Sequence, residues 1–127
     1  MNEEILVGQR YCLDLHGADN GWQDEPEGGH RWTNGHAIFT LPERGHIESI
    51  EVQAVNHLPE VRNVELRCGT ARACTSLKPG LRQSLTVPAH GRKLEIFCQA
   101  FRPIDWIAGN VDIRVLGIAV ESIKLRV

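Results

Sequence analysis

The sequence has no long hydrophobic run and no surplus of basic residues. No apolar stretch approaches the ~20 residues that a helix needs to cross a bilayer, so we expect no membrane span. The 14 Lys and Arg residues against 16 Asp and Glu residues give a formal charge of −2, and we expect no nucleic-acid partner because nothing attracts a phosphate backbone. The acidic start, Met1-Asn2-Glu3-Glu4, differs from the basic start of a signal peptide. We therefore expect a cytoplasmic protein without a cleaved leader.

Common catalytic and cofactor motifs are also missing. The chain has no Gly-x-Ser-x-Gly, no glycine-rich phosphate loop before a helix and no His-Glu-x-x-His. Its six histidines include no His-x-His pair, which a cupin-like metal site would normally supply, so we interpret them as solvated loop residues. We expect no enzyme activity, no metal and no cofactor. A small histidine-dependent metal enzyme is a distant alternative.

The cysteines do not form a recognisable disulfide framework or zinc motif. Cys68 and Cys74 leave five residues between them, whereas zinc ligands usually leave two to four, and Cys12 and Cys98 lie far away. Since Cys68 and Cys98 fall on the apolar phase of their segments, we interpret the cysteines as small core residues in a reducing compartment.

What the sequence does contain is an alternation of apolar and polar residues with a period of two, which predicts half-buried antiparallel strands. Turn-forming residues separate these segments, and no stretch keeps an apolar face at helical spacing. We predict an all-β fold of seven to nine strands in a two-sheet antiparallel β-sandwich or jelly roll, as a single domain over residues 1–127. The alternating segments are 11–15, 37–41, 50–54, 64–68, 85–87 and 94–100.

The last alternating segment changes phase. Leu116, Ile118 and Val120 occupy even positions, whereas Ile123 and the apolar residues after it occupy odd ones. Because a shift of one residue moves every side chain to the other face of a sheet, a bulge or bend is expected near residues 121–122.

A glycine-rich segment over residues 21–33 is the strongest candidate for a functional loop. It holds two of the three tryptophans, three carboxylates and an arginine. A tryptophan face can stack on a sugar ring while carboxylate and guanidinium groups bond the hydroxyls. The alternative is that the tryptophans close one end of the sandwich. The candidate carbohydrate ligands are Trp22, Glu25, Glu27, Arg31 and Trp32.

Two motifs of this chain resemble a known module. The first joins Gly21-Trp22, Pro26-Glu27 and Arg31-Trp32-Thr33 to an alternating strand, and the second runs from Asp112-Ile113-Arg114 through Leu116-Gly117. Together they resemble a β-sandwich module attached to bacterial glycosyltransferases and other polysaccharide-making proteins. Ile113 stands where that family usually has proline. The resemblance implies an accessory domain and not a catalytic one.

Asp112 and Arg114 share one face of a predicted strand that is otherwise rich in apolar residues. An ion pair there must be satisfied, and Glu27, Glu25 or the loop backbone are the expected partners. We interpret the pair as a clasp between the last strand and the tryptophan loop, or alternatively as the polar lining of a saccharide pocket. If the pair is buried, Arg114→Ala should lower the free energy of unfolding by about 3–5 kcal/mol.

Phe97 and Phe101 lie off the core phase of their segment. They form either an apolar face for a partner protein or a second copy, or two rings covered by loops. Two functions follow from these observations. One is a non-catalytic module that binds carbohydrate or supports a glycosyltransferase in bacterial cell-surface polysaccharide metabolism, and the other is a structural or protein-interaction domain without a sugar site.

Overall fold

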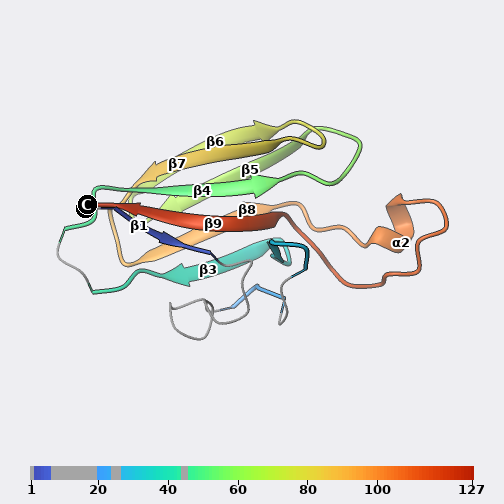
Figure 1. Ribbon diagram of the computed structural model, residues 1–127, viewed down its shortest axis with the longest axis horizontal. Helices are drawn as coiled ribbons and strands as arrows, with labels where there is room; N and C mark the ends of the chain where they lie inside the picture. The colour runs from blue at the N-terminus through green and yellow to red at the C-terminus, as the bar shows by residue number, and fades with distance from the viewer. Residues whose placement is uncertain (1, 7–19, 24–26, 44–45) are drawn as a thin grey trace.

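The protein is a sandwich of two antiparallel sheets (Figure 1). A computed structural model describes residues 2–6, 20–23, 27–43 and 46–127. One sheet has the strand order β1-β9-β4-β7, with β2 also paired to β9, and the other has the order β3-β8-β5-β6. The two-sheet prediction is therefore confirmed. The strands are β1 (Asn2–Ile5), β2 (Arg31–Trp32), β3 (His36–Thr40), β4 (Ser49–Val55), β5 (Arg62–Cys68), β6 (Ala71–Leu77), β7 (Arg82–Pro88), β8 (Lys93–Cys98) and β9 (Ala119–Arg126).

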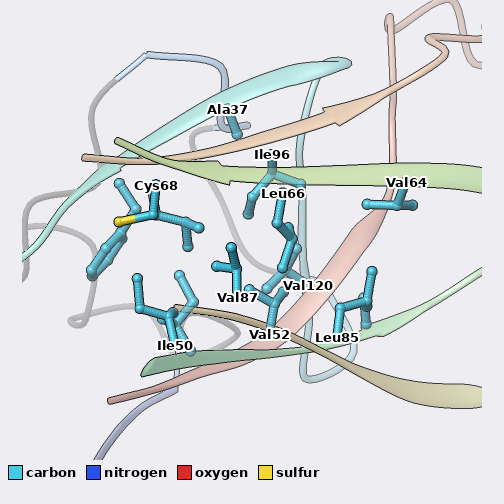
Figure 2. Packing of buried hydrophobic residues seen from close by; sticks show 14 of the residues in the cluster. Ala37, Ile50, Val52, Val64, Leu66, Cys68, Leu85, Val87, Ile96 and Val120 are labelled. Atoms are coloured by element: carbon cyan, nitrogen blue, oxygen red, sulfur yellow. The ribbon is translucent and has the colours of Figure 1, made fainter. Parts of the chain in front are cut away.

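The core lies between the two sheets. Figure 2 shows Ile96 of β8 and Leu66 of β5 facing Val52 of β4 and Val87 of β7. Buried residues alternate with exposed or half-buried ones along most of these strands, as the alternation in the sequence predicts. Burial of this apolar surface supplies the main driving force for folding.

The phase change in the last strand is a β-bulge. In the pairing of β4 with β9, Gln53 lies opposite Ser122, while the next residue, Ala54, lies opposite Val120. Glu121 is therefore the extra residue, which confirms the expected irregularity. The bulge lets the apolar side chains on both sides of Glu121 face the same core.

Some elements differ from the sequence-based expectation. Strand β6 carries small and polar residues with no apolar alternation, so its pattern did not mark it as a strand. Residues 116–118 precede β9, and a single helical turn, α2 (Pro103–Trp106), follows β8. The predicted strand over residues 11–15 lies outside the described residues.

The cysteine prediction holds for two positions and fails for a third. Cys68 and Cys98 are buried free thiols, and burial raises the pKa of Cys98. Cys74 is exposed because it lies on the outward phase of β6. Cys12 lies outside the described residues. In the part of the chain that the structure describes, no helix has the length and apolar character needed to cross a membrane.

Candidate functional site

Residues 27–30, between Trp22 and Trp32, form a tight hairpin. The N–H of Glu27 donates to the carbonyl of His30 at 2.8 Å, and the N–H of His30 donates back at 3.0 Å. Gly28 and Gly29 make the turn between them with φ values of +55° and +84°, which glycine adopts without strain. As directly paired residues, Glu27 and His30 present their side chains on one face. Trp32, two residues after His30, shares that face, and Arg31 takes the opposite one.

The two sequence motifs meet directly in space. Thr33 is fully buried, and its backbone and hydroxyl bind the segment before β9. The N–H of Ile118 donates to Thr33 Oγ1 at 3.0 Å, and the N–H of Gly117 donates to the Thr33 carbonyl at 2.7 Å. The Arg-Trp-Thr motif and the Leu-Gly motif thus form one packed contact.

Residues 111–115 lie before β9 and are not part of a strand. The prediction that Asp112 and Arg114 lie on a strand is therefore wrong. Asp112 and Arg114 turn inward, while Val111, Ile113 and Val115 are exposed. Arg114 donates through Nε to both oxygens of Asp112 at 3.0 Å and through Nη2 to Asp112 Oδ2 at 2.6 Å.

Arg114 also pairs with Glu27 of the hairpin. Its Nη1 donates to Glu27 Oε1, and its Nη2 lies 3.4 Å from Glu27 Oε2. Hydrogen bonds from Arg114 lower the pKa of Asp112, and the two carboxylates raise the pKa of Arg114. The contact joins the two motifs, but the Arg114 side chain remains 38% exposed and that of Glu27 43%. The condition of a buried pair, on which the loss of about 3–5 kcal/mol depends, is not met, because both side chains are open to water.

These groups border a hollow of about 280 Å³ at the end of the sandwich next to α2. We call it the aromatic hollow. Its polar rim comes from the hairpin and from residues 110–114, and its wall comes from aromatic and aliphatic side chains. The lining residues on which the argument below depends are Glu27, His30, Trp32, His57, Asp112 and Arg114.

Four rings form the wall of the aromatic hollow. Trp32 contacts His30, His57 and Phe101, with ring centroids at 5.6, 5.5 and 5.9 Å. His30 and His57 lie 5.0 Å apart. Burial, and after it the proximity of His57, lowers the pKa of His30. The wall is therefore a packed aromatic surface beside two carboxylates.

The hollow contains some of the predicted ligands and leaves out others. Glu27 and Trp32 line it, but only 8% of Trp32 is exposed, so most of its ring is packed. Trp22 packs against the main core, and its Nε1–H donates to the Ile38 carbonyl at 3.0 Å. Arg31 is buried outside the hollow and donates to the Gln23 carbonyl at 3.2 Å. Glu25 lies outside the described residues.

Phe97 and Phe101 do not form one face. Phe101 is buried in a small second core with Trp32, Leu58, Leu116 and Ala119. Phe97 lies on the outer surface of the other sheet, where the ring of His36 stacks on it at 4.2 Å and the guanidinium of Arg67 lies 4.7 Å from its centroid. The alternation that placed them together stops at Cys98, where β8 ends.

His57 and Asn110 also line the hollow, although the sequence did not mark them, and so does Phe101, which the sequence marked only as a possible partner contact. His57 follows β4 in a turn, and its position in the sequence alone resembles that of any solvated histidine. Only its approach to His30 and Trp32 distinguishes it, and this depends on the long-range pairing of β2 with β9.

Among the described residues, no group of three or more His, Cys, Asp or Glu side chains is arranged to hold a metal ion. Comparison of the chain with family models, curated proteins and solved structures finds no match. The resemblance to a glycosyltransferase-associated module remains a prediction from the two motifs.

Proposed function

We propose that the chain is a non-catalytic β-sandwich module that binds carbohydrate in the aromatic hollow, as an accessory to a glycosyltransferase in bacterial polysaccharide metabolism. The supporting observation is that one hollow combines carboxylates and a guanidinium from the two motifs with a wall of aromatic rings. Saccharide sites need this combination of apolar surface and a few fixed polar groups.

The geometry also supports a binding role over glycoside hydrolysis. A glycosidase needs two carboxyl groups on opposite sides of the scissile bond, one of them with a raised pKa. Here Glu27 and Asp112 bind the same guanidinium, and the pKa of Asp112 is lowered. Both features favour acceptors for sugar hydroxyls over an acid that protonates a leaving group.

Amide chemical shifts of the ¹⁵N-labelled protein, titrated with bacterial cell-surface polysaccharides, test this proposal. Single-site affinity is expected to be weak, near 1 mM or about −4 kcal/mol. The shifted amides should belong to the lining of the aromatic hollow. Glu27→Gln should reduce binding, whereas Glu43→Gln should not, because Glu43 is an exposed carboxylate in another region. The proposal fails if no polysaccharide shifts these amides or if the shifts map to the Phe97 surface.

A second candidate function is protein interaction. Six large apolar side chains are exposed over a short stretch next to α2, and Val111 and Ile113 are 84% and 68% exposed. We call this set the apolar strip: Ile104, Trp106, Ile107, Val111, Ile113 and Val115. Exposed apolar groups gathered in this way are typical of protein contact surfaces. Sedimentation velocity of the parent and of a Val111→Ser, Ile113→Ser variant tests for self-association through the strip.

A further inference from the structure

The positive and negative charges of the side chains that line the aromatic hollow do not cancel. Among the described residues, its lining contains two carboxylates, Glu27 and Asp112, and one guanidinium, that of Arg114. Hydrogen bonds from Arg114 lower the pKa of Asp112, which keeps this carboxylate ionised near neutral pH. The three groups together have an excess of one negative charge. A ligand that enters the hollow therefore meets a negative potential.

Arg114 has little capacity left for an acidic ligand. Its Nε donates to both oxygens of Asp112, and its Nη2 donates to Asp112 and lies near Glu27. Its Nη1 donates to Glu27. All three nitrogens are thus engaged with carboxylates of the protein. A sugar carboxylate would have to displace one of these partners and would then face it unpaired.

The carboxylates, in contrast, remain accessible as acceptors. The side chain of Glu27 is 43% exposed and that of Asp112 is 27% exposed. Each carboxylate oxygen accepts more than one hydrogen bond. A donor on the ligand can therefore bind them without breaking the contacts with Arg114.

The aromatic wall favours the same kind of ligand. His30, Trp32 and His57 pack side by side next to the carboxylates. Burial and His57 disfavour a positive charge on His30, so His30 does not offset the carboxylates near neutral pH. Aromatic rings beside carboxylates provide both dispersion contacts and electrostatic attraction for an ammonium group.

We propose that the aromatic hollow selects a cationic amino sugar, with the ammonium group of an unacetylated hexosamine donating to Glu27 and Asp112. The proposal rests on the carbohydrate-binding function given above and specifies its ligand class. The pyranose ring would pack beside His57, which is the exposed ring of the wall. Neutral sugars should bind less tightly, and uronic acids should bind least.

A matched series of β-1,4-linked tetrasaccharides tests this proposal on one backbone. Its members are built from glucose, N-acetylglucosamine, glucosamine and glucuronic acid, and binding is followed by amide shifts of the hollow. We expect the glucosamine tetramer to bind about tenfold more tightly than the glucose tetramer, because it adds a charge-assisted hydrogen bond. Added salt should reduce this ratio, because it screens an exposed charge pair.

Two variants test whether the preference for the glucosamine tetramer depends on Glu27 in the hollow. Glu27→Gln keeps the size of the side chain and removes its charge, so the tenfold ratio should fall towards one. Glu43→Gln removes a carboxylate that also pairs with an arginine but is more exposed and lies elsewhere, so it should leave the ratio unchanged. Thermal melting of each variant establishes that it is folded. If the ratio persists in Glu27→Gln, the ammonium does not bind at this carboxylate and the proposal is wrong.

The outcomes separate the two proposals. Equal affinity for the glucose and glucosamine tetramers, or tightest binding of the glucuronic acid tetramer, overturns the amino-sugar inference and leaves the carbohydrate function standing. Ethanolamine serves as a sugar-free amine. If it shifts the hollow amides and no tetrasaccharide does, the hollow binds ammonium groups and the carbohydrate function is rejected. If nothing shifts them, both proposals are rejected.

Discussion

Gly117 lies so close to Thr33 that a Cβ atom on this glycine would stand 2.5 Å from the threonine hydroxyl oxygen. The backbone nitrogen of Gly35 would be only 2.6 Å away. The absence of a side chain at residue 117 therefore allows the segment before β9 to approach the end of the tryptophan hairpin. This contact, and not a ligand, explains part of the second sequence motif.

Gly117→Ala is expected to destabilise the protein by about 1–3 kcal/mol or more, since the added methyl group must displace backbone. Urea unfolding measures the change. Gly109→Ala is the control, because a Cβ atom there meets nothing within 4 Å and only its φ of +77° is unfavourable. A smaller loss for Gly117→Ala than for Gly109→Ala would contradict the crowding.

Much of the fold is predictable from the sequence, because one face of each central strand is buried and the alternation records it. Ile50, Val52 and Leu66 follow this pattern and lie in the core. Strand β6 could not be found in this way, since the polar Thr75 lies on its inward face and the less polar Cys74 on its outward face. The bulge in β9 could be predicted because the phase change near Glu121 is visible in the sequence itself.

The site was only partly predictable. The contact between Glu27 and Arg114 could be predicted from their opposite charges and from the need to satisfy an ion pair. The exposure of the two side chains could not be predicted from the sequence. The positions of His57 and Phe101 depend on how distant segments pack at the end of the sandwich, which local spacing does not encode.

Arg114→Ala is expected to lower the free energy of unfolding by about 1 kcal/mol or less, because exposed ion pairs contribute little. Urea unfolding at low and high salt measures this loss and its screening. Arg92→Ala is the matched control, since Arg92 and Glu43 form a more exposed pair. A loss of several kcal/mol would mean that the clasp excludes water in solution.

The tryptophans should differ in their contribution to stability. Trp32→Ala removes a buried ring of the second core and should cost about 3–5 kcal/mol, whereas Trp106→Ala on the apolar strip should change stability by less than about 0.5 kcal/mol. Trp22→Phe should cost about 1 kcal/mol through the lost hydrogen bond to Ile38. Thermal melting compares the three. A fully stable Trp32→Ala variant would show that Trp32 is not a structural plug.

Acidification should destabilise the protein in two ranges. The pKa of His30 is lowered from 6.5 by burial and by His57, against the opposing effects of Glu27 and Glu121. The unfolded chain therefore binds more protons, and the free energy of unfolding falls as the pH drops through this value. The pKa of Asp112 is lowered from 3.8, so its contribution is complete above that value and is lost as the pH falls through its lower folded pKa.

Melting temperatures of the parent and of His30→Asn, measured between about pH 8 and pH 5, test the first range. The variant should lose less stability than the parent on acidification. His46→Asn replaces an exposed histidine away from the hollow and should follow the parent. Parallel curves for the parent and His30→Asn would show that His30 titrates as it does in the unfolded chain.

The position of the hollow relative to the carboxyl-terminal residue Val127 affects how a carrier would present the hollow to a ligand. Val127 and α2 lie at opposite ends of the long axis (Figure 1), and the hollow lies beside α2. A carrier joined after Val127 would hold the hollow outward, away from the attachment. Many copies held in this way could engage a repeating polymer together, and such avidity can exceed single-site affinity by about 10²–10⁴-fold. A carrier with many millimolar sites would then stay bound to a polymer surface from which a single copy dissociates quickly.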